Sequence, residues 1–116
     1  MKLRKKFSIY VPSTVDVDKP IDNSAYVEKT ARFLSEHFGG CTRFDAVGNW
    51  IASDEKLVAE KVTICYAFCD VATYYKNILA VKRYARALCA EMRQEAISVE
   101  YCGKLTFEDA KKTGKL

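Results

Sequence analysis

Hydrophobic and polar positions alternate along parts of this chain and recur at helical spacing along others. Alternation from Leu3 to Val11 predicts a strand, and the turn-forming residues from Pro12 to Asn23 predict a loop. Hydrophobic residues spaced three or four positions apart between Ser24 and Phe38 then predict a helix. Gly39 is expected to end this helix, because glycine readily adopts the left-handed conformation of a helix C-cap.

A long hairpin is predicted between Thr42 and Phe68, with its tip at Ser53 to Lys56, a polar cluster between two strand-like runs. The second strand alternates between a strongly hydrophobic set and a set of smaller or more polar residues. We expect the hydrophobic set to face the core. It consists of Val62, Ile64, Tyr66 and Phe68.

Gly48-Asn49 interrupts the first strand of this hairpin directly before Trp50, the only tryptophan of the chain. Straight pairing from the predicted tip would turn Phe44 toward the small-residue side of its neighbour. We therefore expect a one-residue bulge at Gly48-Asn49 that places Phe44 opposite Ile64 and leaves Trp50 on the uncovered face. The alternative is a hairpin turn at Val47 to Asn49, because Gly-Asn is also a turn signal.

A second helix is predicted from Val71 to Arg93, with most of its basic side chains off the apolar stripe. A strand over Ala96 to Tyr101 and a short extra strand over Lys104 to Phe107 follow. The order βαββαβ is typical of the ferredoxin-like α+β fold, in which an antiparallel sheet carries both helices on one face. We expect residues 1–107 to form this single domain and residues 108–116 to form a flexible basic tail.

The face of the sheet away from the helices is where we expect a binding surface. Small residues at its centre and a large aromatic at its margin would let a partner lie flat on it. A second copy of the protein is the expected occupant, because twofold dimers dominate among oligomers. A solvated face with one stray tryptophan is the alternative. The candidate binding residues are Trp50, Tyr10, Arg43, Asp45, Lys61, Thr63 and Cys65.

Composition narrows the classes of function. A chain of 116 residues suits one domain, and a net charge of +4 spread over both helices and both ends is less dense than a nucleic-acid groove usually needs. The five cysteines are an odd number without a secretory signal, which favours reduced thiols and a cytoplasmic protein. No segment has the apolar length of a membrane span.

The chain contains no recognisable catalytic or cofactor motif. We find no P-loop, dinucleotide turn, nucleophile elbow or zincin signature. The lone His37 suits the C-terminal end of a helix dipole, and its spacing from Cys41 fits no catalytic mechanism. Cys65 and Cys69 approach a zinc-ligand spacing without a second pair. We therefore expect no catalytic residue, no metal and no cofactor.

Short sequence patterns extend over most of the chain. They are FSIYVPST at Phe7 to Thr14, FGGCT at Phe38 to Thr42, AVGNW at Ala46 to Trp50, and RQEAISVE at Arg93 to Glu100. On these patterns the chain resembles a group of small, poorly characterised bacterial proteins found in Firmicutes and their mobile elements. The resemblance implies a fold and a genomic setting. By analogy with other small mobile-element proteins, it also implies an anti-CRISPR-type inhibitor.

We expect from these observations a non-enzymatic, homodimeric protein-binding module that acts by contact with a host protein. The first alternative is an RNA- or nucleotide-binding domain that uses Tyr10, Trp50, Arg43 and Lys61. Alternation disfavours it, because the large aromatics of the central strands are expected to face the core. The second alternative is a cofactor-independent enzyme of the dimeric α+β-barrel kind.

Overall fold

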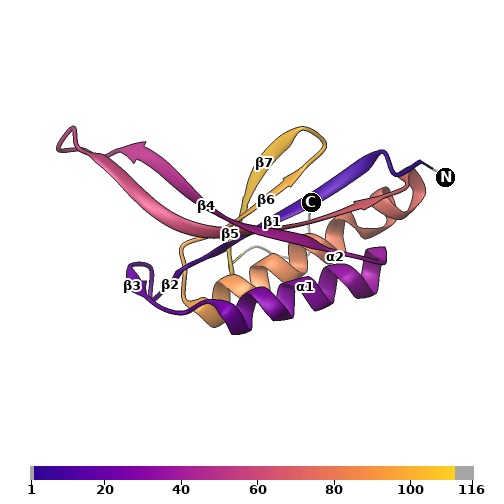
Figure 1. Ribbon diagram of the computed structural model, residues 1–116, viewed down its shortest axis with the longest axis horizontal. Helices are drawn as coiled ribbons and strands as arrows, with labels where there is room; N and C mark the ends of the chain where they lie inside the picture. Colours follow the sequence, from indigo (N-terminus) through magenta and orange to yellow (C-terminus); the bar gives the residue numbers. More distant parts are fainter. Residues whose placement is uncertain (1, 112–116) are drawn as a thin grey trace.

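The computed structural model describes residues 2–111; the last five residues of the expected tail lie outside the described part. The chain forms an antiparallel sheet of five strands in the order β4-β5-β1-β6-β7, with both helices on one side (Figure 1). The ferredoxin-like α+β prediction with an extra terminal strand is thereby confirmed. The elements are β1 (Lys5–Pro12), β2 (Thr14–Val15), β3 (Lys19–Pro20), α1 (Ser24–Phe38), β4 (Thr42–Ile51), β5 (Leu57–Cys69), α2 (Val71–Met92), β6 (Ile97–Tyr101) and β7 (Lys104–Glu108).

The hydrophobic core lies between the sheet and the two helices. α1 packs mainly against β5, whereas α2 packs against β6 and β1. The apolar stripe expected for the second helix is buried along its whole length. Its members are Tyr74, Ile78, Val81, Ala85, Leu88 and Met92. The periodicity of this segment therefore identified both the helix and the face that it buries.

The ends of the helices follow from local hydrogen bonding. Gly39 has a φ of 87°, and its backbone N–H donates to the carbonyl of Ser35 at 2.8 Å. The predicted glycine stop is thereby confirmed. At the start of α2 the carboxylate of Asp70 accepts a hydrogen bond from the backbone N–H of Thr73 at 2.7 Å, which caps the first turn.

The expected loop between β1 and α1 contains a small hairpin, β2–β3, which the sequence analysis did not predict. Its turn holds Asp16 and Val17 at positive φ, and their backbone N–H groups donate to the carbonyls of Met92 and Arg93 at the end of α2. Two-residue strands leave no alternation to detect. The hairpin is stabilised by this tertiary contact, which a local pattern cannot reveal.

The bulge expected at Gly48-Asn49 is wrong, and so is the alternative turn at Val47 to Asn49. β4 pairs with β5 one residue to one, and Phe44 lies opposite Ile64 without a bulge. The extra residue lies in the turn, because the first pair of the hairpin is Ile51 with Leu57 and Glu55 takes a positive φ of 67°. Trp50 consequently lies opposite Val58, within a regular strand.

The assignment of β5 to the two faces of the sheet is also wrong. We call the helix-covered side of the sheet the inner face and the opposite side the outer face. The large residues Phe7, Ile9 and Val11 of β1 occupy the inner face, and their partners on β5 are the small residues. The large side chains of β1 and α2 together fill most of the space on the inner face, which leaves room only for small side chains on β5. The set directed to the outer face is therefore Val62, Ile64, Tyr66 and Phe68.

Two basic residues of α2, expected off its apolar stripe, are buried beneath β7. Arg86 Nε donates to Glu108 Oε1 at 2.9 Å, and Lys82 Nζ lies 3.6 Å from Glu108 Oε2. Lys82 also donates to the hydroxyl of Tyr101 at 3.1 Å. Glu108 itself is fully buried, so this ionic cluster joins the last strand to the second helix.

Candidate functional site

A cleft opens on the inner face where the β4–β5 hairpin extends beyond the helices. We call the projecting end of this hairpin, residues 47–61, the arm (Figure 1). Between the arm and the N-terminus of α1 lie two adjoining cavities of about 440 and 500 Å³, both lined by Asp22, Asn23, Asp45 and Thr63. We call them together the inner cleft. Each volume falls in the range of about 300–1,000 Å³ that is usual for small-molecule sites.

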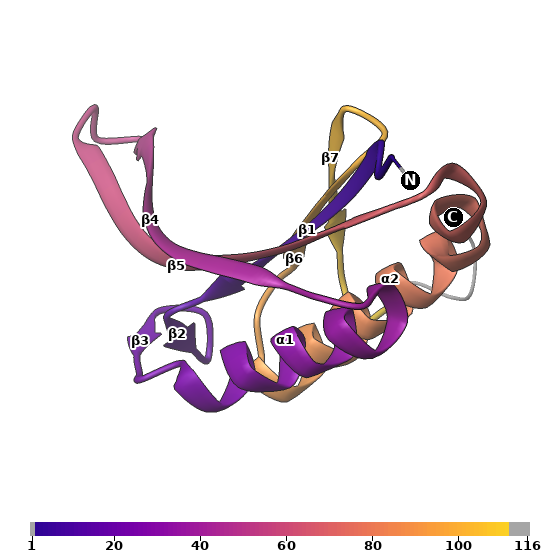
Figure 2. The same ribbon diagram turned by 45° about the vertical axis from the view of Figure 1, so that its right-hand side comes forward.

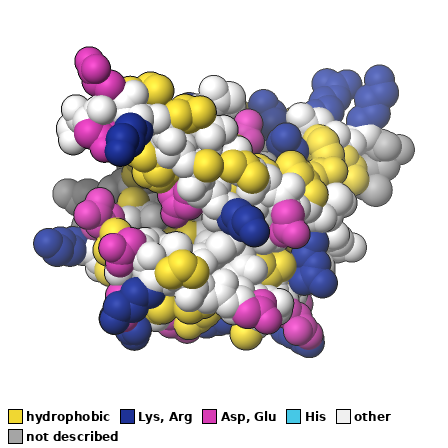
Figure 3. Space-filling model, turned by 60° about the vertical axis from the view of Figure 1, so that its left-hand side comes forward, with side chains coloured by type: hydrophobic (Ala, Val, Ile, Leu, Met, Phe, Trp, Pro, Cys, Tyr) yellow, Lys and Arg dark blue, Asp and Glu magenta, His cyan; other side chains and the backbone are white. Residues whose placement is uncertain are grey.

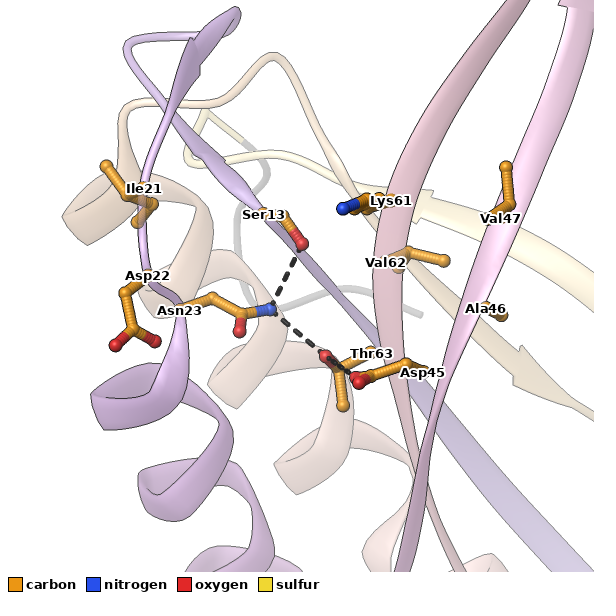
Figure 4. Close-up of a pocket in the computed structure, with 10 residues that line it drawn as sticks. All are labelled: Ser13, Ile21, Asp22, Asn23, Asp45, Ala46, Val47, Lys61, Val62 and Thr63. Atoms are coloured by element: carbon orange, nitrogen blue, oxygen red, sulfur yellow. Dashed lines mark hydrogen bonds between the residues drawn. The ribbon is translucent and has the colours of Figure 1, made fainter.

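A chain of hydrogen bonds crosses the floor of the inner cleft. Asn23 Nδ2 donates to Thr63 Oγ1 at 3.2 Å, and Thr63 Oγ1 donates to Asp45 Oδ1 at 2.9 Å (Figure 4). Asn23 Nδ2 is also 3.3 Å from the carbonyl oxygen of Pro12, which fixes its side chain to the end of β1. Thr63 is buried, whereas Asp45 is exposed at the cleft. One oxygen of Asp45 is thus held by the fold while the carboxylate stays open to a ligand.

Charges of both signs surround this floor. Asp22 lies at the start of α1, and hydrogen bonds from the hydroxyl and backbone N–H of Ser24 hold its pKa below the usual value. Arg43 and Lys61 reach the cleft from β4 and β5, on either side of Asp45. The arrangement can bind a small molecule that carries both a cationic and an anionic group.

The structure divides the candidate binding residues of the sequence analysis between two faces. Arg43, Asp45, Lys61 and Thr63 come together at the inner cleft. Tyr10 and Trp50 instead lie on the outer face, since Tyr10 pairs with Ile64 and Trp50 with Val58. The expectation of one shared surface was wrong for two reasons: the faces of β5 had been exchanged, and without the expected bulge Trp50 pairs with Val58 and so points to the face opposite Lys61 and Thr63.

Cys65, the remaining candidate, is fully buried under the helices. Burial is the main reason that the pKa of its thiol is raised to about 12, so the thiol stays protonated and unreactive at neutral pH. His37 lies exposed at the end of α1 with Nδ1 2.9 Å from the carbonyl oxygen of Phe33. Neither residue takes part in the inner cleft.

Asn23 and Asp22 are the site residues that the sequence analysis missed. Asn23 ended the loop predicted from the sequence, and in the structure it occupies the N-cap position of α1. Its side chain makes no cap hydrogen bond and instead points across to β5. The Asp-Asn pair at the start of a helix was a local signal for polar groups. Its proximity to Thr63, forty residues away in the sequence, depends on the tertiary fold.

Two hairpins flank the outer face, and we call the part of this face between them the trough. In Figure 2 the β4–β5 and β6–β7 hairpins both rise on the side away from the helices, with β1 between them. Burial and the nearby charge of Glu100 raise the pKa of Tyr10 at its floor. Large hydrophobic side chains are exposed on this face, and Figure 3 shows several hydrophobic patches on the arm side of the molecule. The exposed hydrophobic residues of the outer face are Phe44, Trp50, Phe68, Leu105 and Phe107, each 45–59% exposed.

Within residues 2–111, no group of three His, Cys, Asp or Glu side chains is arranged to hold a metal ion. In the same part of the chain, neither helix has the length and apolar character needed to cross a membrane.

Comparison with solved structures gives the same fold in an enzyme. A phage SAM lyase in complex with S-methyl-5'-thioadenosine superposes with a TM-score of 0.59 at 14% sequence identity, covering 97% of both chains. The apo state of a phage SAM lyase gives a TM-score of 0.60 at 16% identity, again over 97% of each chain. At these identities the likeness shows the fold. No protein-family model and no curated protein sequence matches the chain.

This comparison overturns the expectation of a non-enzymatic binding module. Both matched structures are of a lyase, and the match covers the whole α+β domain. An inhibitor of the anti-CRISPR type was inferred from the absence of catalytic motifs and from a genomic setting, and neither is evidence against catalysis. The prediction that the protein is not an enzyme is corrected accordingly.

Proposed function

We propose that the protein is a lyase that cleaves a sulfonium nucleoside, with S-adenosylmethionine as the substrate to test first. The observation that carries the proposal is the agreement in fold with phage SAM lyase over 97% of both chains. Among the classes of function considered from the sequence, only the cofactor-independent enzyme is an enzyme, as the phage SAM lyase of these structures is. A fold can carry unrelated functions, so the proposal also needs a site that suits the chemistry.

The chemistry explains how a chain without a catalytic motif can be an enzyme. A sulfonium sulfur is already a good leaving group, because it takes the electron pair of the broken carbon–sulfur bond and becomes a neutral thioether. S-methyl-5'-thioadenosine is the thioether left when the amino-acid chain departs from S-adenosylmethionine. The bond that breaks joins the sulfur to the γ-carbon of the amino-acid chain, and the carboxylate of that same chain forms the new carbon–oxygen bond to this carbon, which gives a lactone. The protein then has to bind and orient the substrate and place negative charge near the sulfur.

The inner cleft supplies groups of the required kinds. The carboxylate of Asp45, held by Thr63, attracts the sulfonium or the ammonium group of the substrate. Arg43 and Lys61 are placed to bind its carboxylate. The side chains of Ile21 and Val47, which line the same cleft, offer apolar surface to the nucleoside. Thr63 and Asn23 are positioning residues, because they act through Asp45.

Incubation of the purified protein with S-adenosylmethionine tests this proposal. We expect S-methyl-5'-thioadenosine to accumulate in proportion to enzyme concentration, as measured by liquid chromatography. S-adenosylmethionine also decomposes slowly by itself, so buffer alone and heat-denatured protein are the controls. Accumulation no faster than in these controls would rule out lyase activity on this substrate.

We also propose that a second copy of the protein covers the outer face. The exposed hydrophobic side chains of the trough lie together on one face of the sheet, whereas the exposed hydrophobic residues of a monomer are usually scattered singly. The arm adds Val47, Ile51 and Leu57, which are 58–67% exposed on its inner side. Because the arm carries apolar side chains on both of its sides, it suits contact with a second copy of the chain. Self-complementary packing of two sheets is a common form of dimer.

A charge placed on the outer face is expected to prevent this association. Phe44 is 48% exposed and contacts Tyr66 edge to face, so Phe44→Glu should leave the monomer folded while making burial against a second copy unfavourable. We expect light scattering to give an oligomer for the unmodified protein and a monomer for this variant. Val17→Glu, at a similarly exposed residue in the β2–β3 turn, should keep the oligomer. A monomeric unmodified protein would contradict the proposal.

A further inference from the structure

A separate cavity lies at the start of β1. The pairing of β1 with β6 consists of Ser8 with Glu100 and Ile9 with Val99. Beyond these pairs, the start of β1 and the turn between β6 and β7 line a cavity of about 440 Å³, which we call the N-terminal cavity. It is lined by Arg4, Lys5, Lys6, Tyr74, Tyr75 and the Cys102–Gly103 turn, together with Glu100 and Tyr101. At about 3.3 Å per residue, β1 separates this cavity from the inner cleft by roughly 25 Å.

Basic side chains lie around this cavity. Arg4, Lys5 and Lys6, at the start of β1 and just before it, line the cavity together with one carboxylate, that of Glu100. Lys6 Nζ also lies 5.4 Å from the ring centre of Tyr66 on the outer face. Lys104 of β7 adds a further cation, with its Nζ 4.9 Å from the ring centre of Tyr101. Buried Lys82 lies by the same ring, at 5.1 Å, but its charge is paired with that of Glu108. No dense basic stripe is visible in the sequence, but the fold brings Lys104 of β7 close to the cations at the start of β1.

Aromatic rings lie among these cations. Lys5 Nζ is 5.6 Å from the ring centre of Tyr74 and 5.9 Å from that of Tyr75, within the range of cation–π attraction. Tyr74 is buried, and its hydroxyl accepts a hydrogen bond from the backbone N–H of Cys102, which fixes the turn against α2. Tyr75 is 57% exposed, so its ring is free to contact a planar ligand. The cavity thus combines a fixed wall, several cations and an accessible aromatic ring.

We propose that the N-terminal cavity binds a phosphate-bearing ligand, with its phosphates on Arg4 and Lys5 and a base stacked on Tyr75. The guanidinium of arginine binds phosphate oxygens in pairs, and lysine adds a compact positive charge. Stacking of a base on an exposed aromatic ring requires no particular base sequence. A free nucleotide and a nucleic-acid strand share this chemistry. The site is separate from the inner cleft, so it does not depend on the lyase activity.

Calorimetric titration at low salt with tripolyphosphate, ATP and a single-stranded decanucleotide tests this site. We expect the Arg4→Ala/Lys5→Ala double variant to bind all of these probes at least tenfold more weakly. Tyr75→Ala should weaken ATP and the oligonucleotide while leaving tripolyphosphate unchanged. Tighter binding of ATP than of the oligonucleotide would identify a nucleotide site, and the reverse order would identify a nucleic-acid strand.

The matched control is Lys19→Ala/Lys56→Ala, which removes the same charge from exposed residues elsewhere on the molecule. It should bind as the unmodified protein does. Equal weakening by both double variants would show a general effect of net charge and would overturn the proposal, as would the absence of binding by every probe. Circular dichroism of each variant, together with its rate of S-adenosylmethionine cleavage, would show that loss of binding is not caused by unfolding.

Discussion

Glu108→Gln is expected to lower the free energy of unfolding by about 3–5 kcal/mol, the usual cost of removing one partner from a buried ion pair. The carboxylate of Glu108 is fully buried and lies within 4 Å of the charged groups of both Arg86 and Lys82. Glutamine keeps the shape but leaves two buried cations without this countercharge. Because a domain of this size is stable by only about 5–15 kcal/mol, the change should be visible as a large decrease in the urea midpoint.

Two further variants separate this effect from general damage. Lys82→Met removes one cation and leaves Arg86 paired with Glu108 at 2.9 Å, so its loss should be smaller than that of Glu108→Gln. Glu36→Gln, on the exposed side of α1, should change the midpoint little. Equal midpoints for Glu36→Gln and Glu108→Gln would mean that the buried cluster contributes nothing to stability.

The pattern of the sequence was sufficient to predict the elements and their order. The stripe from Tyr74 to Met92 and the glycine stop at Gly39 are local signals, and both helices and the long hairpin were predicted within a few residues of their observed bounds. The β2–β3 hairpin was missed because its strands are too short for alternation to be visible. Its stability comes from the end of α2.

The faces of β5 show why alternation is not enough. Alternation separates the residues of a strand into two sets, but only the neighbouring elements decide which set is buried. Here the bulky residues of β1 and α2 fill the inner face, so Cys65 and Ala67 fit there, and Tyr66 turns outward. The more hydrophobic set on the outer face is the surface that the proposed second copy would cover. Alternation within one chain carries no information about such a copy.

The candidate site was predicted in part for a related reason. Arg43, Asp45, Lys61 and Thr63 were grouped correctly, because residues at alternate positions on paired strands share a face whichever face that is. Asn23 was not added to them, since the approach of a helix N-terminus to a strand depends on how the helix packs. The absence of a motif was misinterpreted as an absence of chemistry, whereas the proposed substrate, with its built-in leaving group, would require mainly binding and orientation.

Asp45→Asn is expected to reduce kcat/KM for S-adenosylmethionine by about a hundredfold, an effect typical of removing one electrostatic contact to the transition state. Asparagine has the same shape, and its side-chain oxygen still accepts the hydrogen bond from Thr63. Because Asp45 is exposed, the fold should be unaffected, and thermal unfolding provides the check. Thr63→Val should give a smaller loss, which Thr63→Ser should recover, since serine retains the hydroxyl that positions Asp45.

Glu60→Gln is the control that locates the active site. Glu60 belongs to the same strand, but its position opposite Gly48 places it on the outer face, where a small cavity contains both Glu60 and Tyr10. If the inner cleft is the active site, Glu60→Gln keeps nearly full activity. Loss of activity in Glu60→Gln but not in Asp45→Asn would instead place catalysis in the trough. Loss of both activity and association in Trp50→Glu, at an outer-face residue outside both cavities of the inner cleft, would make the active site dependent on the second copy. Each of these results leaves the lyase assay of the unmodified protein unchanged, so the location of the site and the reaction are tested separately.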